Sequence, residues 1–152
     1  MRNNEKSNFL YIKNIFESIS NEYDFMNDLM TFKNHSKWKE EIVEIAIDSS
    51  PKKILDIATG TGDIAIKLSR IKGSIIEAVD VSDNMLKIAH NKIDKLNINN
   101  INLKTCEAEN LVFDDNQFDI ISIGYGVRNF TNLTKGLSES YRVLKNNGKL
   151  II

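Results

Sequence analysis

The chain has 152 residues, 41% of them hydrophobic and 27% charged, which is typical of a single globular domain. Its formal net charge of −1 excludes tight binding driven by overall charge, so no nucleic-acid partner is expected. The single cysteine, Cys106, excludes an internal disulfide and offers no metal-ligand pair, so we expect no metal and a reducing, cytoplasmic setting. No apolar run approaches the roughly 18 residues of a membrane span, so any membrane contact is expected to be peripheral.

The first third of the chain predicts helices. Apolar residues recur at helical spacing in two stretches. Their apolar positions are Phe9, Ile12, Phe16 and Ile19 in the first stretch, and Trp38, Ile42, Ile45 and Ala46 in the second. Residues 23–30, between them, mix aromatic and polar side chains without a clean period. We therefore expect residues 1–49 to form an N-terminal helical cap.

From residue 50 the pattern changes to short apolar runs that alternate with amphipathic stretches. The runs at residues 53–58, 74–80, 101–105, 118–124 and 149–152 predict strands. Three helices are predicted from apolar faces at Ile64, Leu68 and Ile71, at Leu86, Ala89, Ile93 and Leu96, and at Leu133, Leu137, Tyr141 and Leu144. This alternation is typical of an α/β fold with a parallel sheet covered on both faces. Residues 50–152 are thus expected to form the α/β core of one structural domain.

The last predicted strand leaves a sheet edge open. Asn147-Gly148 is expected to turn the chain into it, and the chain stops inside it, which leaves an apolar edge open to pairing. We expect either further residues in the natural protein or another cover for this edge.

Two features indicate a ligand site where the strands end. The sequence Asp56-Ile57-Ala58-Thr59-Gly60-Thr61-Gly62 stands where the first core strand turns into a helix, and glycines there let the backbone approach a ligand closely. Asp80 ends the second strand, where a carboxylate is able to accept hydrogen bonds from both hydroxyls of a ribose. Ligand crevices of open α/β sheets lie at the carboxyl ends of the strands, so both features indicate one nucleoside site.

Dinucleotide binding is the competing interpretation. Gly60, Gly62 and Ala65 satisfy the pattern G-x-G-x-x-A, and Asp80 follows about 20 residues later, as the dinucleotide fingerprint requires. Asp56 argues against it, because a carboxylate there would repel a pyrophosphate and attract an ammonium or sulfonium group. After the third strand, Cys106-Glu107-Ala108-Glu109 offers an acid and backbone groups for an adenine. These two features favour a cationic methyl donor.

Three segments resemble the C-methyltransferase family of ubiquinone and menaquinone biosynthesis. Tyr23-Asp24-Phe25-Met26-Asn27, through Met30-Thr31 to His35 and Trp38, is similar to the family's signature Y-D-x-M-N, M-S or M-T, H and W. Ala58-Thr59-Gly60-Thr61-Gly62-Asp63 is similar to its cofactor loop, which many methyltransferases share. Gly124-Tyr125-Gly126-Val127-Arg128-Asn129 and Tyr141-Arg142-Val143-Leu144-Lys145 are similar to its specific segments F-G-x-R-N and R-V-L-K-P-G-G.

The resemblance covers essentially the whole chain and implies a Rossmann-like class I methyltransferase fold without its last strands, with residues 1–49 on the substrate side. It implies S-adenosyl-L-methionine as cofactor, with contacts at Thr61, Asp80, Glu107, Ala108 and Gly124. The expected cofactor-binding set, with the loop residues and the neighbour of Asp80, is Asp56, Gly60, Thr61, Gly62, Asp80, Val81, Glu107, Ala108 and Gly124. Glu107 stands where the family usually has Asn, and Gly124 where it has Ser.

The implied reaction is the C-methylation of a prenylated quinol, either a demethylmenaquinol or a polyprenyl-methoxy-benzoquinol. Arg128 is the candidate cation that faces the developing phenolate, and His35 is the candidate base. Tyr23 and Asn27 are candidates for positioning the quinol oxygens. Each has a structural alternative, since Arg128 could pair with an acid, His35 could pack beside Trp38, and the other two could fasten the cap to the core.

Two other functions stay open at this point. The cofactor motifs do not name the acceptor, so the chain could methylate another small molecule, or it could be a truncated cofactor-binding fragment without activity. The implied substrate is greasy, which predicts peripheral contact with the inner face of a membrane. The sequence leaves a homo-oligomer open.

Overall fold

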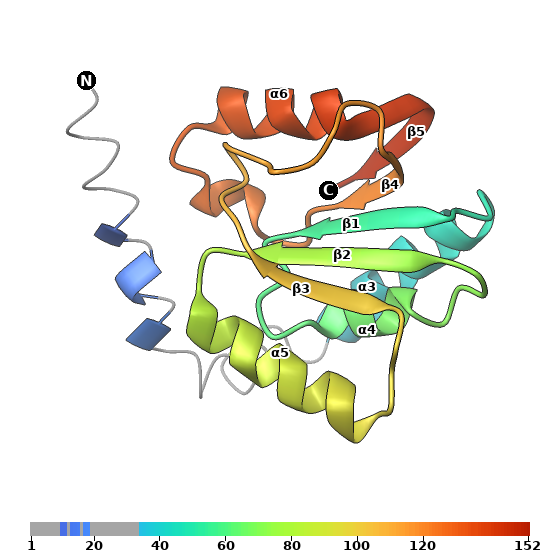
Figure 1. The fold of residues 1–152 in the computed structure, drawn as a ribbon, viewed down its shortest axis with the longest axis horizontal. Coiled ribbons are helices and arrows are strands. Elements are labelled where there is room, and N and C mark those ends of the chain that lie inside the picture. The colour runs from blue at the N-terminus through green and yellow to red at the C-terminus, as the bar shows by residue number, and fades with distance from the viewer. Residues whose placement is uncertain (1–9, 12, 16, 19–33) are drawn as a thin grey trace.

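Five parallel strands form one sheet in the computed structural model, which describes residues 10, 11, 13–15, 17, 18 and 34–152. The strands are β1 (Lys53–Ile57), β2 (Ile75–Asp80), β3 (Ile101–Thr105), β4 (Phe118–Ser122) and β5 (Leu144–Ile151). Their order across the sheet is β3-β2-β1-β4-β5 (Figure 1). Because β1 lies in the middle and the order reverses beside it, a crevice is expected at its carboxyl end. The predicted parallel α/β sheet is confirmed.

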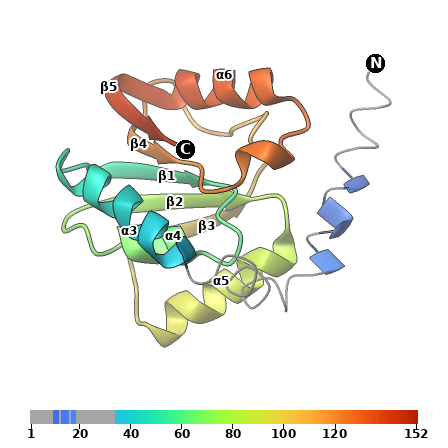
Figure 2. The ribbon, with the colours of Figure 1, turned by 180° about the vertical axis from the view of Figure 1, so that it is seen from behind.

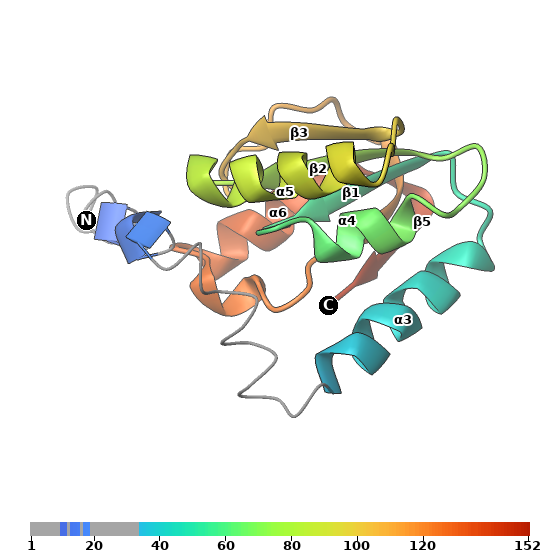
Figure 3. The same cartoon turned by 90° about the horizontal axis from the view of Figure 1, so that it is seen from below.

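Helices cover both faces of this sheet. They are α3 (Asn34–Ile47), α4 (Asp63–Leu68), α5 (Asp83–Lys95) and α6 (Leu133–Val143), with a short 3₁₀ turn, η1 (Val127–Asn129). Figure 2 shows α3 and α4 in front of the sheet, and Figure 3 shows α4 and α5 along the same side. Successive strand residues point to opposite faces, so Ile54 packs with α3 and α4 whereas Leu55 packs in the second core with Val143 of α6.

The predicted apolar positions Ile64, Leu68, Ile71, Leu86, Ala89 and Ile93 are buried as expected, and Leu96 is exposed. The faces of α3 and α6 differ from those predicted. In α3, Ile42, Val43 and Ala46 are buried, whereas Trp38 and Ile45 are 47% and 46% exposed. In α6, Tyr141 is 81% exposed and Leu133 48% exposed, and the buried residues are Gly136, Ser140 and Val143. Small residues form this face because the ring of Phe130 lies directly against Gly136, where a side chain would overlap it. The predicted apolar face of α6 was therefore wrong.

The last strand also begins earlier than predicted. Leu144 is the first residue of β5 and not the end of a helical face, because α6 ends at Val143. Asn147-Gly148 lies inside β5, and the register against β4 shifts between Phe118 and Ile120. Asn147 has φ 66°, a left-handed conformation that accommodates this bulge.

The N-terminal predictions are only partly covered. Phe9, Ile12, Phe16, Ile19 and residues 23–30 lie outside the described residues, and the division between residues 49 and 50 stays a prediction. The part that is described shares a core with the sheet, since Ile42 and Val43 of α3 pack with Ile54 and Ile64. Within the described residues, no helix is both long and apolar enough to cross a membrane.

Candidate functional site

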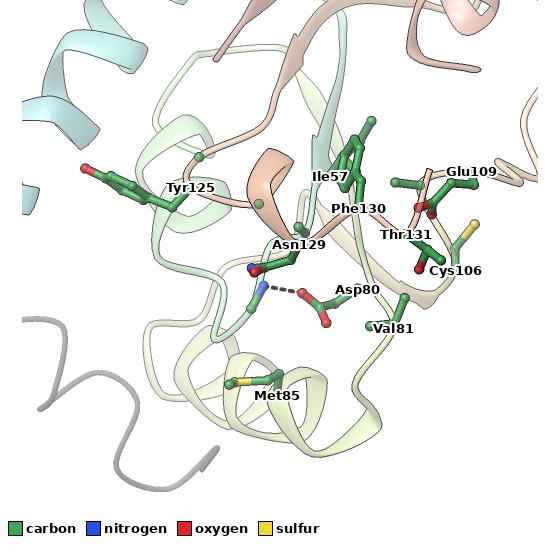
Figure 4. Close-up of a pocket in the computed structure, with 15 residues that line it drawn as sticks. Ile57, Asp80, Val81, Met85, Cys106, Glu109, Tyr125, Asn129, Phe130 and Thr131 are labelled. Carbon is green, nitrogen blue, oxygen red and sulfur yellow. Dashed lines mark hydrogen bonds between the residues drawn. The ribbon is translucent and has the colours of Figure 1, made fainter. Parts of the chain in front are cut away.

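A hollow opens at the carboxyl ends of β1, β2, β3 and β4, where the sequence places its ligand site (Figure 4). The space within it is about 680 Å³, including the part open to solvent. The lining residues are Ile57, Ala58, Gly60, Asp80, Val81, Met85, Cys106, Ala108, Glu109, Gly124, Tyr125, Gly126, Asn129, Phe130 and Thr131. Five of these belong to the predicted cofactor-binding set: Gly60, Asp80, Val81, Ala108 and Gly124.

Asp80 is the charged centre of the hollow and joins two strand ends. One carboxylate oxygen accepts a hydrogen bond from the backbone N–H of Gly60 (2.8 Å), and the other accepts one from Ser82 (2.9 Å). Burial raises the pKa of Asp80, and the backbone N–H groups of Ser82, Gly60 and Val81 oppose that rise. A carboxylate oxygen has two lone-pair sites, so each oxygen keeps the capacity to accept from a ligand hydroxyl.

Asp56 lies beneath the loop and does not line the hollow. Its two carboxylate oxygens accept hydrogen bonds from the hydroxyls of Ser122 and Thr59, both at 2.6 Å, and its side chain is 1% exposed. Burial raises its pKa to about 6, although both hydroxyls and a backbone hydrogen bond oppose the rise. In this geometry Asp56 ties β1 to β4 and to the loop, and its direct contact with a ligand stays a prediction.

The glycine loop has an open front and a packed back. Gly60, with φ 56°, has no other atom within 4 Å of the position a Cβ would take, so the loop presents bare backbone to the hollow. Gly62, with φ 84°, caps α4 and lies against Ala89 of α5, where a Cβ would come within 2.9 Å of the alanine Cβ. The hydroxyl of Thr61 accepts a hydrogen bond from Lys92 Nζ (3.0 Å), which places that side chain on the α5 side of the loop.

The backbone segments that follow β1 and β4 pack tightly against each other at the rim of the hollow. Ala58 and Tyr125 both have positive φ, 55° and 63°, a conformation that costs a non-glycine residue about 1–2 kcal/mol. A Cβ on Gly126 would overlap the Cβ of Ala58, and a Cβ on Gly124 would overlap the Cδ1 methyl of Ile64. Strained backbone of this kind concentrates at ligand sites, which agrees with the position of the hollow.

In the segment after β3, the predicted acid Glu107 does not line the hollow that contains Asp80. Glu107 is exposed and lines a second, adjoining hollow together with Lys13 and Asn110, while Val81 and Cys106 line both hollows. Glu109, in contrast, lines the first hollow and is only 9% exposed. The sequence offered both acids in one segment, and only the fold distinguishes them.

The predicted catalytic residues are not gathered in the described part of the hollow. Arg128 lies in η1, beside the lining residue Asn129, and is exposed; no hydrogen bond or ion pair joins it to another described residue. His35 falls in α3, and the structure leaves its side chain undescribed. Tyr23 and Asn27 lie outside the described residues. The roles of all four stay predictions.

Several lining residues were missed by the sequence analysis. Met85, Phe130 and Thr131 supply apolar and hydroxyl surface, and Asn129 follows directly after Arg128 in a segment already singled out. Figure 4 shows the bond from the glycine loop to Asp80, whereas Tyr125 points away from the other labelled side chains. The ring of Tyr125 instead lies 6.1 Å from that of Trp38. Asn129 lies in a motif singled out in the sequence, as do the lining residues Ile57, Ala58, Cys106, Glu109, Tyr125 and Gly126, whereas Met85, Phe130 and Thr131 lie outside those motifs.

The buried charge of Asp56 predicts a pH-dependent stability. The folded pKa of about 6 exceeds the ordinary value of 3.8, so the folded state holds this proton more tightly, and its stabilising effect is lost as pH rises through 6. For Asp56→Asn we expect this dependence to disappear. The difference in unfolding free energy, wild type minus variant, should fall by about 1 kcal/mol between pH 5 and pH 7.5 in urea titrations. Identical pH dependence in the two proteins would contradict the assignment.

The contact between Gly124 and Ile64 predicts an energetic coupling. Gly124→Ser should destabilise the fold by about 1–3 kcal/mol, because the new side chain overlaps the Ile64 Cδ1 methyl. Ile64→Val removes that methyl and should cost about 0.5–1.5 kcal/mol alone. The double variant should be more stable than the sum of the two losses by about 0.5 kcal/mol or more, as measured by urea unfolding. Strict additivity would show that the methyl moves aside freely.

Comparisons with known proteins agree with this architecture. The profile of the ubiE/COQ5 methyltransferase family matches residues 2–152. The ubiquinone/menaquinone biosynthesis C-methyltransferase UbiE of Shewanella pealeana is 42% identical over 144 residues, which are 93% of this chain and 57% of that protein. The chain therefore spans less than three fifths of that relative's length.

Solved structures share the fold at lower identity. The YcgJ protein of Bacillus subtilis matches with a TM-score of 0.67 and 27% identity, over 73% of this chain and 49% of that one. A SAM-dependent methyltransferase from Aquifex aeolicus matches with a TM-score of 0.59 and 28% identity, over 62% of this chain and 51% of its own. With the family profile covering all but the first residue, the chain belongs to the ubiE/COQ5 methyltransferase family.

Proposed function

We propose that this chain binds S-adenosyl-L-methionine in the hollow beside Asp80 and takes part in the C-methylation of a prenylated quinol, in menaquinone or ubiquinone biosynthesis. The observation that carries the proposal is Asp80 itself, a buried carboxylate at the end of β2 that lines the hollow and keeps acceptor capacity toward it. Family membership supplies the reaction class, because the matched relative is named a C-methyltransferase.

The residues of the hollow fit the nucleoside part of this donor. The two hydroxyls of a ribose are donors, and Asp80 offers two acceptor oxygens. Gly60 has open space where a side chain would stand, so the loop does not obstruct a sugar. Val81, Met85 and Phe130 give apolar surface for a flat base. When bound, S-adenosylmethionine would supply a methyl group on a positively charged sulfur.

The quinol hydroxyl must lose its proton for the ring carbon to accept the methyl group. A quinol hydroxyl resembles tyrosine, whose pKa is about 10, so ionising it at pH 7 costs about 4 kcal/mol without assistance. Arg128 is exposed on η1, next to Asn129 in the wall of the hollow, and a guanidinium there would stabilise the phenolate that develops. His35 as base, and Tyr23 and Asn27 as quinol contacts, complete the proposal from the family resemblance.

The alternatives differ in what they require of this chain. Family membership favours a methyl donor over a dinucleotide, and Asp56 no longer decides between them because it lies beneath the loop. Methylation of another small molecule keeps Asp80 and changes only the acceptor. A cofactor-binding fragment keeps binding and loses transfer, and the transfer assay below separates it.

We place the protein in the cytoplasm, in contact with the membrane surface through its substrate. The support is chemical, since a prenylated quinol resides in the bilayer while its ring must reach the hollow. Running the transfer assay with the quinol in vesicles tests this, because a protein confined to solution would methylate only detergent-dispersed quinol.

Binding of the donor should depend on Asp80. For Asp80→Asn we expect calorimetric titration of S-adenosylmethionine to show a loss of about 10- to 150-fold in affinity, the worth of a charge-assisted hydrogen bond. Glu77→Gln is the matched control, because Glu77 lies on the same strand and does not line the hollow.

The ligand can be altered as well as the protein. S-adenosylhomocysteine without its 2′-hydroxyl should bind the wild type more weakly than the parent compound, and Asp80→Asn should no longer distinguish the two. A folded wild-type chain that binds neither ligand would refute the proposed cofactor site.

Arg128 should matter for transfer and not for donor binding. Arg128→Met keeps the length of the side chain but removes its charge, so transfer of a labelled methyl to a short-chain prenylated quinol should fall about 10²- to 10³-fold. Donor affinity should stay unchanged, and Arg128→Lys should recover part of the rate. Full transfer by Arg128→Met would overturn the assignment, and donor binding without transfer by the wild type would identify a binding fragment.

A further inference from the structure

Arg142, at the end of α6, uses all five N–H donors of its guanidinium. Two bonds go to the carboxylate of Glu139, from Nε and Nη2, both 2.8 Å long. The others go to the backbone carbonyls of Leu111 (2.9 Å) and Phe113 (2.8 Å) and to Asp115 (2.8 Å). A planar fork with every donor engaged holds its partners in one geometry.

Glu139 completes the arrangement from the other side. Its Oε2 accepts a hydrogen bond from the backbone N–H of Leu111 (3.0 Å), so the Glu139–Arg142 pair binds both polar backbone groups of that residue. The pKa of Glu139 lies below its usual range because of the hydrogen bonds from Arg142. The pair is therefore ionised at neutral pH, and it anchors the segment after β3 to the surface of α6.

The same segment is tied to the start of α6 through the wall of the hollow. Glu109 Oε1 accepts a hydrogen bond from the backbone N–H of Asn132 (3.1 Å), the residue that caps α6. Glu109 lines the hollow on one side, and Phe130 and Thr131, directly before Asn132, line it on another. The position of the 106–109 wall relative to the 130–131 wall is thus set at both ends of α6.

We propose that Arg142 and Glu139 are positioning residues of the ligand site, which hold the wall formed by Cys106, Ala108 and Glu109 at the spacing that the nucleoside requires. Neither side chain lines the hollow, so both act through the segment they bind. The identity of the ligand rests on the function proposed above, whereas the positioning itself rests on these contacts.

A second ion pair supplies a matched control. Lys145 Nζ donates to Asp119 (2.7 Å), whose other oxygen accepts from the backbone N–H groups of Lys52 and Lys53 (both 2.9 Å). This pair also joins a side chain next to α6 to backbone groups of a distant segment. It lies at the amino-terminal start of β1, away from the hollow.

The test compares Arg142→Ala with Lys145→Ala by two readouts. Cys106 is the chain's single cysteine, is 8% exposed and lies in the wall, so its rate of reaction with a thiol reagent reports opening of that wall without any ligand. We expect Arg142→Ala to react faster and to bind S-adenosylhomocysteine roughly 3- to 30-fold more weakly. Lys145→Ala should change neither the thiol rate nor the affinity. Urea unfolding of both variants measures their losses of stability, so that the two readouts are compared at equal stability.

Equal thiol rates and equal affinities in the two variants would show that Arg142 serves stability alone and would overturn the proposal. Arg142→Lys, which keeps the charge without the fork, should give intermediate values, and Glu139→Gln provides a milder variant should Arg142→Ala fail to fold. A wild type that binds no S-adenosylhomocysteine would count against the proposed function. The thiol rates would then still decide whether the pair holds the wall.

Discussion

The carboxylate of Asp80 is the interaction on which the site depends. A buried acid at the end of β2 must be satisfied, and backbone N–H groups from two different segments, at Gly60 and Ser82, do so. The same bonds bring the glycine loop after β1 against the end of β2 and define one side of the hollow. Each oxygen accepts from one of these amides and keeps a second lone-pair site, and the residue borders the hollow. In the function proposed here, the carboxylate that joins these two segments is also the one that binds the ligand.

Asp56 and Asp80 show how environment separates two acids on neighbouring strands. Asp56 is held by two hydroxyl groups beneath the loop, and burial still raises its pKa to about 6. Asp80 receives backbone amides and borders the hollow. Both residues were predicted to contact the ligand, since both stand at the carboxyl end of a strand, where the crevice lies. Their separation depends on the face to which each side chain points, and β1 turns that of Asp56 toward Ser122 of β4.

The sequence predicted the features of the fold that depend on neighbouring residues alone. The parallel sheet follows from continuous apolar runs, and the hollow from a glycine loop and Asp80 at two strand ends. The face of α6 did not follow, because Gly136 and Ser140 are buried by the fit of Phe130 against the helix rather than by their hydrophobicity. The different positions of Glu107 and Glu109 also depend on a partner far along the chain, the N–H of Asn132. Contacts across 20 or more residues leave no periodic trace.

The segment between β3 and β4 explains why α6 contains an ion pair at all. Residues 106–117 form neither helix nor strand, so their backbone groups lack the partners that a crossover helix would provide. Leu111 and Phe113 find those partners in Glu139 and Arg142. In the proposal above, these bonds also hold the neighbouring wall of the hollow in place. Arg142 stands in the R-V-L-K segment on which the family resemblance partly rests. Its chemistry gives that segment a physical role, because the planar guanidinium bonds the backbone carbonyls of Leu111 and Phe113 in this irregular part of the chain.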